Sequence, residues 1–135
     1  MSDILIIIKT LCASLGAILG AFLGGLSGLL VALVALMICD YITGVLCAIK
    51  SHMVNSSTGF WGIVKKCLIL MMVGVANLLD VNVVGSGSVL RSSVVMFYMA
   101  NDGISILENI GKLGLPIPNK LRVVLEQLKE ADDEQ

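Results

Sequence analysis

Residues 10–39 read TLCASLGAILGAFLGGLSGLLVALVALMIC and contain no charged residue. As one continuous α-helix, this stretch would be about 45 Å long at 1.5 Å per residue. The hydrocarbon core of a bilayer is about 30 Å thick, so a single span cannot contain it. The run Gly24-Gly25-Leu26-Ser27-Gly28 lies where a break is needed, and glycine readily adopts the backbone conformations of a break. The stretch therefore predicts two hydrophobic helices, at about 4–23 and 27–49.

The composition of the 135-residue chain indicates a lipid environment. Hydrophobic residues make up 57% of the chain and charged residues 14%, whereas water-soluble domains carry about 25% charged residues. So few charges could not cover a compact globule with polar surface. The formal net charge of −1 provides no basic field for binding nucleic acid. We therefore expect a multi-pass integral membrane protein with no nucleic-acid partner.

A third hydrophobic segment follows a polar connection at 50–62. This segment is expected to be helical over about 61–80. Trp61 favours the headgroup level of a membrane, and Lys65 and Lys66 can extend their ammonium groups to the same interface. These three residues are therefore predicted to anchor the helix at the membrane surface.

A fourth segment, expected to be helical over about 91–110, follows a Gly/Ser-rich turn. It carries Asp102 and Glu108 and is the least apolar of the four segments. Such a helix suits a membrane only where partners cover its acidic side. The predicted fold class is therefore all-α, with three to four transmembrane helices. Whether residues 4–23 span the membrane stays open, because charges interrupt their start.

The C-terminal part, residues 111–135, has a different composition from the rest. Glycines and prolines end the fourth helix there, at Gly111, Gly114, Pro116 and Pro118. Apolar residues then recur at helical spacing over 120–130, which predicts a short amphipathic helix followed by an acidic tail. The chain is thus expected to divide into a membrane domain at 1–110 and a cytoplasmic part at 111–135.

Basic residues predict the orientation, because they are enriched in the cytoplasmic connections of membrane proteins. The connection at 50–66 holds three lysines, whereas the connection at 80–91 holds Asp80 and a single arginine. The first connection is therefore expected on the cytoplasmic side of a bacterial inner membrane. This also places the C-terminus in the cytoplasm.

Three acidic residues lie within the predicted membrane helices. Asp40 interrupts an apolar run from Leu26 to Ile49, where a carboxylate costs about 2.5–3.5 kcal/mol on insertion scales. Such a group is expected to face protein or water rather than lipid. Asp40, Asp102 and Glu108 are therefore candidate pore-lining or intramembrane polar residues. For Asp40, a position at the rim of its span remains the alternative.

Gly16, Gly20 and Gly24 recur at intervals of four residues in the first predicted helix. In lipid, helices associate by close packing, which small residues permit, because no hydrophobic effect drives them together. These glycines are therefore predicted to form a helix-packing face. Contact between subunits and contact with the chain's own helices remain equally open.

The sequence contains no arrangement typical of a catalytic or metal site. The four cysteines lie apart in apolar stretches without a Cys-x-x-Cys pair. Asp102 and Glu108 are six residues apart, so they do not stack on one helical face. Neither a nucleophile–base pair nor a phosphate-binding glycine loop is evident. We therefore expect no enzyme, no cofactor and no metal.

Four short motifs stand in order along most of the chain. They are Asp40-Tyr41-Ile42-Thr43-Gly44; Ser56-Ser57 with Gly59, Gly62, Lys65 and Lys66; the stretch Asn101-Asp102-Gly103-Ile104-Ser105-Ile106-Leu107-Glu108-Asn109; and Gly114-Leu115-Pro116-Ile117-Pro118. With them, residues 30–128 resemble the phage lysis and toxin-secretion holins of clostridia and their phages. Asp102 stands where a glutamate is common in that family, which keeps the acid and shortens its reach.

The resemblance implies a function that composition alone does not indicate. Holins of this type accumulate in the bacterial cytoplasmic membrane, associate with copies of themselves and open large non-specific lesions. The lesions release an endolysin or a large toxin. The main alternative is a membrane scaffold or antiholin-like regulator that forms closed oligomers without a pore. Both remain open, because small-residue packing builds rings and closed bundles alike.

Overall fold

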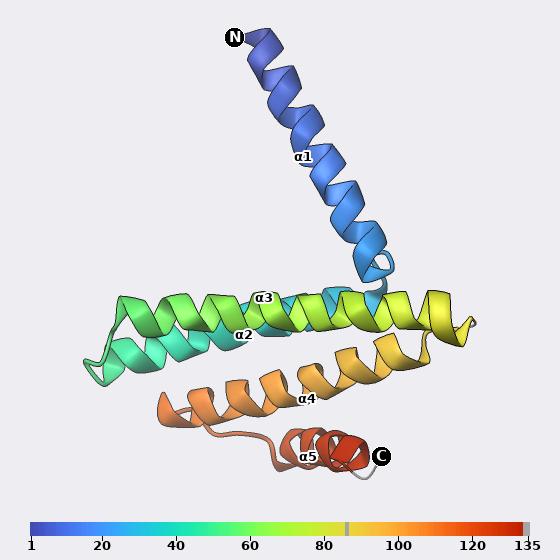
Figure 1. Cartoon of the computed structure of the whole chain (residues 1–135). Coiled ribbons are helices and arrows are strands. Elements are labelled where there is room, and N and C mark those ends of the chain that lie inside the picture. Colours follow the sequence, from blue (N-terminus) through green and yellow to red (C-terminus); the bar gives the residue numbers. More distant parts are fainter. Residues whose placement is uncertain (86, 134–135) are drawn as a thin grey trace.

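The computed structural model describes residues 1–85 and 87–133, and within them it is helical without strands (Figure 1). Its elements are α1 (Ser2–Leu23), α2 (Gly28–Lys50), α3 (Ser56–Leu79), the short π-helix η1 (Asp80–Val84), α4 (Val89–Lys112) and α5 (Asn119–Asp133). Three helical stretches are long and apolar enough to cross a membrane, namely Ser2–Leu23, Gly28–Lys50 and Ser56–Val84. The predicted all-α membrane fold class is confirmed.

Polar residues mark where the helices begin. The Ser27 side chain accepts a hydrogen bond from the Leu30 amide at 3.2 Å and caps α2. Asn55 caps α3 by accepting from the Ser57 amide at 2.9 Å. Because a side-chain oxygen satisfies an otherwise unpaired N–H at each start, α3 begins at Ser56, five residues before the expected 61. The polar residues that follow Asn55 are thus part of the helix rather than of a loop.

Helices α2, α3 and α4 run alongside one another, and the chain turns back after α4 so that α5 packs against it (Figure 1). Their core is formed by side chains from all three bundle helices: Leu30, Leu33 and Met37 of α2, Val73 of α3 and Val95 of α4. These residues lie toward the end of the bundle where α2 begins, α3 ends and α4 begins. The opposite half of the bundle is less tightly filled and contains the polar site described below.

Helix α4 is not among the three membrane-length apolar helices. It buries polar side chains, including Arg91 and Asp102, against the helices that surround it. On its other side, Gly103 faces Leu125 of α5, and an added Cβ there would lie 2.9 Å from the end of that side chain. Neighbouring helices thus cover α4, as expected for a helix that carries acidic residues in a membrane.

Helix α1 projects away from the bundle (Figure 1) and has no buried residue. Its isoleucines and leucines are at least half exposed from Ile4 to Leu19. Only its C-terminal end is attached: the Phe22 ring packs so closely on Gly74 of α3 that any Cβ there would collide with it. An uncovered apolar helix of this length needs lipid or another protein surface around it.

Candidate functional site

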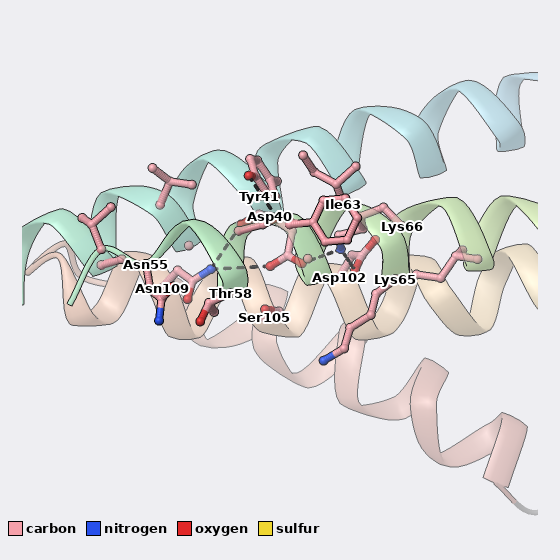
Figure 2. A pocket seen from close by; sticks show the side chains of 18 of the residues that line it. Asp40, Tyr41, Asn55, Thr58, Ile63, Lys65, Lys66, Asp102, Ser105 and Asn109 are labelled. Atoms are coloured by element: carbon pink, nitrogen blue, oxygen red, sulfur yellow. Dashed lines mark hydrogen bonds and ion pairs between the residues drawn. The ribbon is translucent and has the colours of Figure 1, made fainter.

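Three charged side chains from three helices meet inside the bundle. The Lys66 ammonium of α3 lies 2.6 Å from Asp40 Oδ2 of α2 and 2.6 Å from Asp102 Oδ1 of α4 (Figure 2). The side chains of Asp40 and Asp102 are 15% and 7% exposed. We call Asp40, Lys66 and Asp102 the charged layer. A charge-assisted hydrogen bond on each side of one ammonium fixes the three helices relative to one another.

The charged layer is not fully satisfied. Two carboxylates share one ammonium, so the formal charge of the layer is −1. Asp102 Oδ2 is buried and has no hydrogen-bond partner among the described residues. A buried acceptor without a donor costs about 1–3 kcal/mol. The layer is therefore a place where an additional donor or cation would be stabilised.

Asn109 extends the polar network along the contact between α2 and α4. Its amide donates to the Thr43 hydroxyl at 3.0 Å and lies 3.5 Å from Asp40 Oδ1. Its main-chain carbonyl accepts from the Cys47 thiol at 3.3 Å. Four polar side chains of α2 and α4 thus stand in one row, beginning at Asp40.

A groove of about 910 Å³ opens beside the charged layer, between α2, α3 and α4. Asp40, Lys66 and Asp102 line it together with apolar side chains such as those of Val45, Ile63 and Ile69. Figure 2 shows this mixture of polar and apolar groups. The groove can therefore accept an elongated apolar partner that carries a positive charge at one point.

Tyr41 connects α2 and α3 at one side of the groove. Its hydroxyl donates to the Gly59 carbonyl at 3.3 Å. A Cβ at Gly59 or Gly62 would lie 3.3 Å from the Tyr41 ring or hydroxyl. The two glycines of the Ser-Ser-x-Gly-x-x-Gly stretch at residues 56–62 thus let the tyrosine lie against the α3 backbone.

The structure brings together only some of the residues predicted from the sequence. Asp40 and Asp102 meet in the charged layer, whereas Glu108 is exposed and lies in a separate cavity of about 260 Å³ with Arg122 and Glu126. Lys66 points into the bundle instead of extending to the interface (Figure 2).

The remaining predicted anchors and the glycines lie elsewhere. Trp61 and Lys65 are exposed on α3. Gly16 and Gly20 have open space around them, so an added Cβ at either position would contact none of the residues that the structure describes. Gly24 ends α1 in a left-handed conformation with φ of 88°, and a Cβ there would meet Asn77 and Arg91. Gly24 thus serves the end of a helix in this chain.

A second polar cluster, which was not predicted from the sequence, lies where α1, α3 and α4 meet. Buried Arg91 donates through Nε to the Leu23 carbonyl at 2.6 Å and through a terminal nitrogen to the Gly25 carbonyl at 2.9 Å and Ser27 Oγ at 3.3 Å. Asp80 accepts from the amides of Leu90 and Arg91 at 3.0 and 2.8 Å. We call this cluster, with Asn77, the junction.

A sequence signal for both clusters exists. Asp80 and Arg91 flank the Gly/Ser turn, where an acid can cap the next helix and an arginine can reach carbonyls of a preceding helix end. Lys66 lies as deep in α3 as Asp40 and Asp102 lie in α2 and α4, so a third helix that begins at the Asn55 cap indicates a shared layer, whereas the expected start at 61 placed Lys66 near a helix end. Among the described residues, no group of three His, Cys, Asp or Glu side chains could hold a metal ion.

Helices of membrane length that enclose buried charges define an integral membrane protein of the all-helical class. The sequence comparisons give its family. Residues 17–130 match the model of the bacteriophage holin family, and the chain belongs to that family.

Three relatives illustrate the match. A probable holin of Bacillus phage phi105 is 37% identical over 108 residues, which cover 75% of this chain and 79% of the relative. An uncharacterized 14.9 kDa protein of Clostridium perfringens is 40% identical and covers 95% of this chain and 97% of its own length. An uncharacterized protein of Listeria monocytogenes is 36% identical over 76% of this chain and 74% of its own length. No solved structure matches the chain.

Proposed function

We propose that this chain is a holin that associates with copies of itself in the bacterial cytoplasmic membrane and opens large non-specific lesions. Such a lesion lets an endolysin reach the peptidoglycan or a large toxin leave the cell. Membership of the holin family and similarity to a probable phage holin support the proposal. The observation that carries it is the charged layer beside an open groove in an otherwise apolar bundle.

The proposed mechanism uses the cost of charges in hydrocarbon. In one chain, Asp40 and Asp102 are neutralised in part by Lys66, which permits accumulation in the membrane. When copies associate, the bundle faces can rearrange so that the acidic residues border water, where their charge is stabilised. The open face around Gly16 and Gly20 suits close packing between subunits. Glu108 is a further candidate for the wet surface.

The proposed orientation places the connection between α2 and α3 in the cytoplasm. Exposed Lys50 ends α2 at that connection, and its ammonium donates to the Lys112 carbonyl at 2.9 Å; exposed Lys65 lies in the first half of α3. Basic residues favour the cytoplasmic side. Residues 111–135 then begin on the cytoplasmic side of the membrane domain at 1–110, and α5 packs against α4, where Leu125 meets Gly103. Helix α5 runs to Asp133 and so includes the first part of the expected acidic tail, and residues 134–135 lie outside the described residues.

One observation favours the alternative, a scaffold or antiholin-like regulator without a pore. Asp40 and Asp102 are both paired within a single chain, as a closed and inactive bundle requires. Glu108 is exposed and does not belong to that closed set. The two functions therefore differ in whether the charged layer ever opens to water.

Lysis of bacterial cells distinguishes the two functions. The chain is expressed together with an endolysin that lacks a secretion signal, and culture turbidity is recorded. A holin is expected to cause abrupt lysis with the active endolysin, and loss of viability without lysis when the endolysin is catalytically inactive. If the chain accumulates in the membrane and cells with the active endolysin keep growing, the proposal is wrong and the scaffold or regulator is favoured.

A further inference from the structure

The charged layer lacks one positive charge. Asp40 and Asp102 share Lys66, and Asp102 Oδ2 remains buried without a donor. Asp102 also lines the 910 Å³ groove. A positive charge that enters the groove therefore neutralises the layer, and it gains a hydrogen bond when the Asp102 carboxylate turns Oδ2 toward it.

Lys9 of α1 is a complementary group in the same sequence. It is exposed on a helix without buried residues, and it forms no ion pair among the described residues. Within a hydrophobic span, a lysine is costly unless it finds a partner or reaches the interface. The groove beside the charged layer thus lacks a cation, and α1 carries a lysine that has no anionic partner among the described residues.

Lys9 also lies at the depth of the charged layer. The helix ends meet at the junction, where Arg91 donates to the Leu23 carbonyl and Asn77 to the Phe22 carbonyl. At 1.5 Å per residue, Lys9 lies about 21 Å along α1 from its end at Leu23. The three residues of the charged layer lie at similar distances from the same end of the bundle. They are about 18 Å for Asp40 from Gly28, and about 20 Å for Lys66 from Leu79 and for Asp102 from Val89. An α1 helix parallel to the bundle therefore brings Lys9 to the layer.

The α1 helix of the same chain does not make this contact. Its C-terminal end is held by Arg91, by Asn77 and by the packing of Phe22 on Gly74. From that attachment it leads away from α2, α3 and α4 (Figure 1). A second copy presents an equally uncovered α1. A head-to-tail exchange of this kind extends to rings or chains of subunits.

We propose that the groove beside the charged layer receives helix α1 of a second copy of this chain, and that Lys9 of that copy completes the layer. The proposal rests on the self-association in the proposed function and names its contact. The layer then holds two positive and two negative charges. The apolar side chains of α1 near Lys9 cover the apolar groove residues Val45, Ile63 and Ile69. Each chain contributes one helix and receives one.

Disulfide cross-linking between two subunits tests the contact. Cys12 lies three residues beyond Lys9 on the same helical face, and Ile69 lies three residues beyond Lys66 in the groove. Two differently tagged subunits are co-expressed: one retains Cys12 as its sole cysteine, and the other carries Ile69→Cys with all native cysteines replaced. Membranes are oxidised with copper phenanthroline. The matched control is Leu68→Cys, which is exposed on α3 at the same depth and does not line the groove.

The proposal predicts a cross-linked heterodimer from Ile69→Cys that exceeds the Leu68→Cys product by about tenfold, the ratio that 1.4 kcal/mol provides. Equal yields from the two positions, or no heterodimer, would overturn it. A single chain with Cys12 and Ile69→Cys is expected to form dimers and larger species. An internal disulfide that leaves it monomeric would assign the groove to its own α1 and contradict the proposal.

A pair of charge variants tests the role of Lys9 itself. Lys9→Met in one subunit or Asp102→Asn in the other is expected to lower the cross-linking yield about fivefold, and both together no further, because they remove the same interaction. If the two substitutions together lowered the yield by the product of their separate effects, direct pairing of Lys9 with Asp102 would be contradicted. Cross-linking without lysis in the endolysin assay would refute the pore but support the contact between subunits. Lysis without cross-linking would refute only that contact.

Discussion

The junction and the charged layer both contain buried charges, but they differ in whether every charged side chain has its hydrogen-bond partners. At the junction, both Asp80 oxygens accept backbone N–H groups, and Arg91 donates to two carbonyls and a hydroxyl. In the charged layer, Asp102 Oδ2 has no partner and a groove opens beside it. A satisfied network fixes one arrangement, whereas a partly satisfied one is stabilised by a further group. The junction is therefore expected to have a structural role, and the charged layer the assembly role that we propose for it.

The largest stability effect is expected at the junction. Arg91→Met removes three hydrogen bonds from a charged donor and leaves carbonyls at the end of α1 unpaired, at a cost of about 3 kcal/mol. Equilibrium unfolding by SDS in detergent micelles, followed by circular dichroism, measures the change. Arg91→Lys serves as the control, because it keeps the charge and part of the hydrogen bonding. A loss below about 1 kcal/mol would show that the junction does not hold the helices.

Lys66→Met is expected to lower the stability by about 2 kcal/mol, less than Arg91→Met, although it leaves two carboxylates together. The Lys66 side chain is 19% exposed and the groove admits water, which lowers the penalty. Because the remaining cost is repulsion between Asp40 and Asp102, adding Asp102→Asn is expected to restore much of the stability. The same SDS titration tests this. A double variant no more stable than Lys66→Met would argue against that repulsion.

Asp80→Asn and Asp102→Asn provide the sharpest comparison of the two clusters. Asp80→Asn directs an amide group at a backbone N–H that now has a carboxylate acceptor, which costs about 1–2 kcal/mol. Asp102→Asn leaves Lys66 paired with Asp40 and neutralises the layer, so the single chain is expected to lose less than about 0.5 kcal/mol. Equal losses in the two variants would remove the distinction between the clusters.

Much of the fold follows from the sequence, because long charge-free runs and polar breaks predict membrane helices directly. The glycine-rich break at 24–28, the cap at Asn55 and the acidic α4 all have local signals. Ser86, in the expected Gly/Ser turn, lies outside the described residues. The direction of Lys66 could not be predicted from its own segment, since a lysine near a helix end extends to water as readily as it turns inward.

The site required information about packing between helices. Asp40 and Asp102 are recognisable one at a time as costly intramembrane charges. Their meeting depends on the contact of α2 and α4, which no local pattern specifies. Glu108 has the same composition signal and lies elsewhere, because its position on α4 faces α5. The open face at Gly16 and Gly20 leaves their role in self-association a prediction.

Release of size-graded fluorescent dextrans from proteoliposomes tests the central claim most directly. Wild type is compared with Asp40→Leu, which disrupts the charged layer, and with Glu108→Leu, which tests whether that exposed acid also borders the lesion. The account predicts that wild type releases protein-sized dextrans and that Asp40→Leu does not. Retention of even small dyes by vesicles in which the wild-type chain has inserted would contradict the holin function.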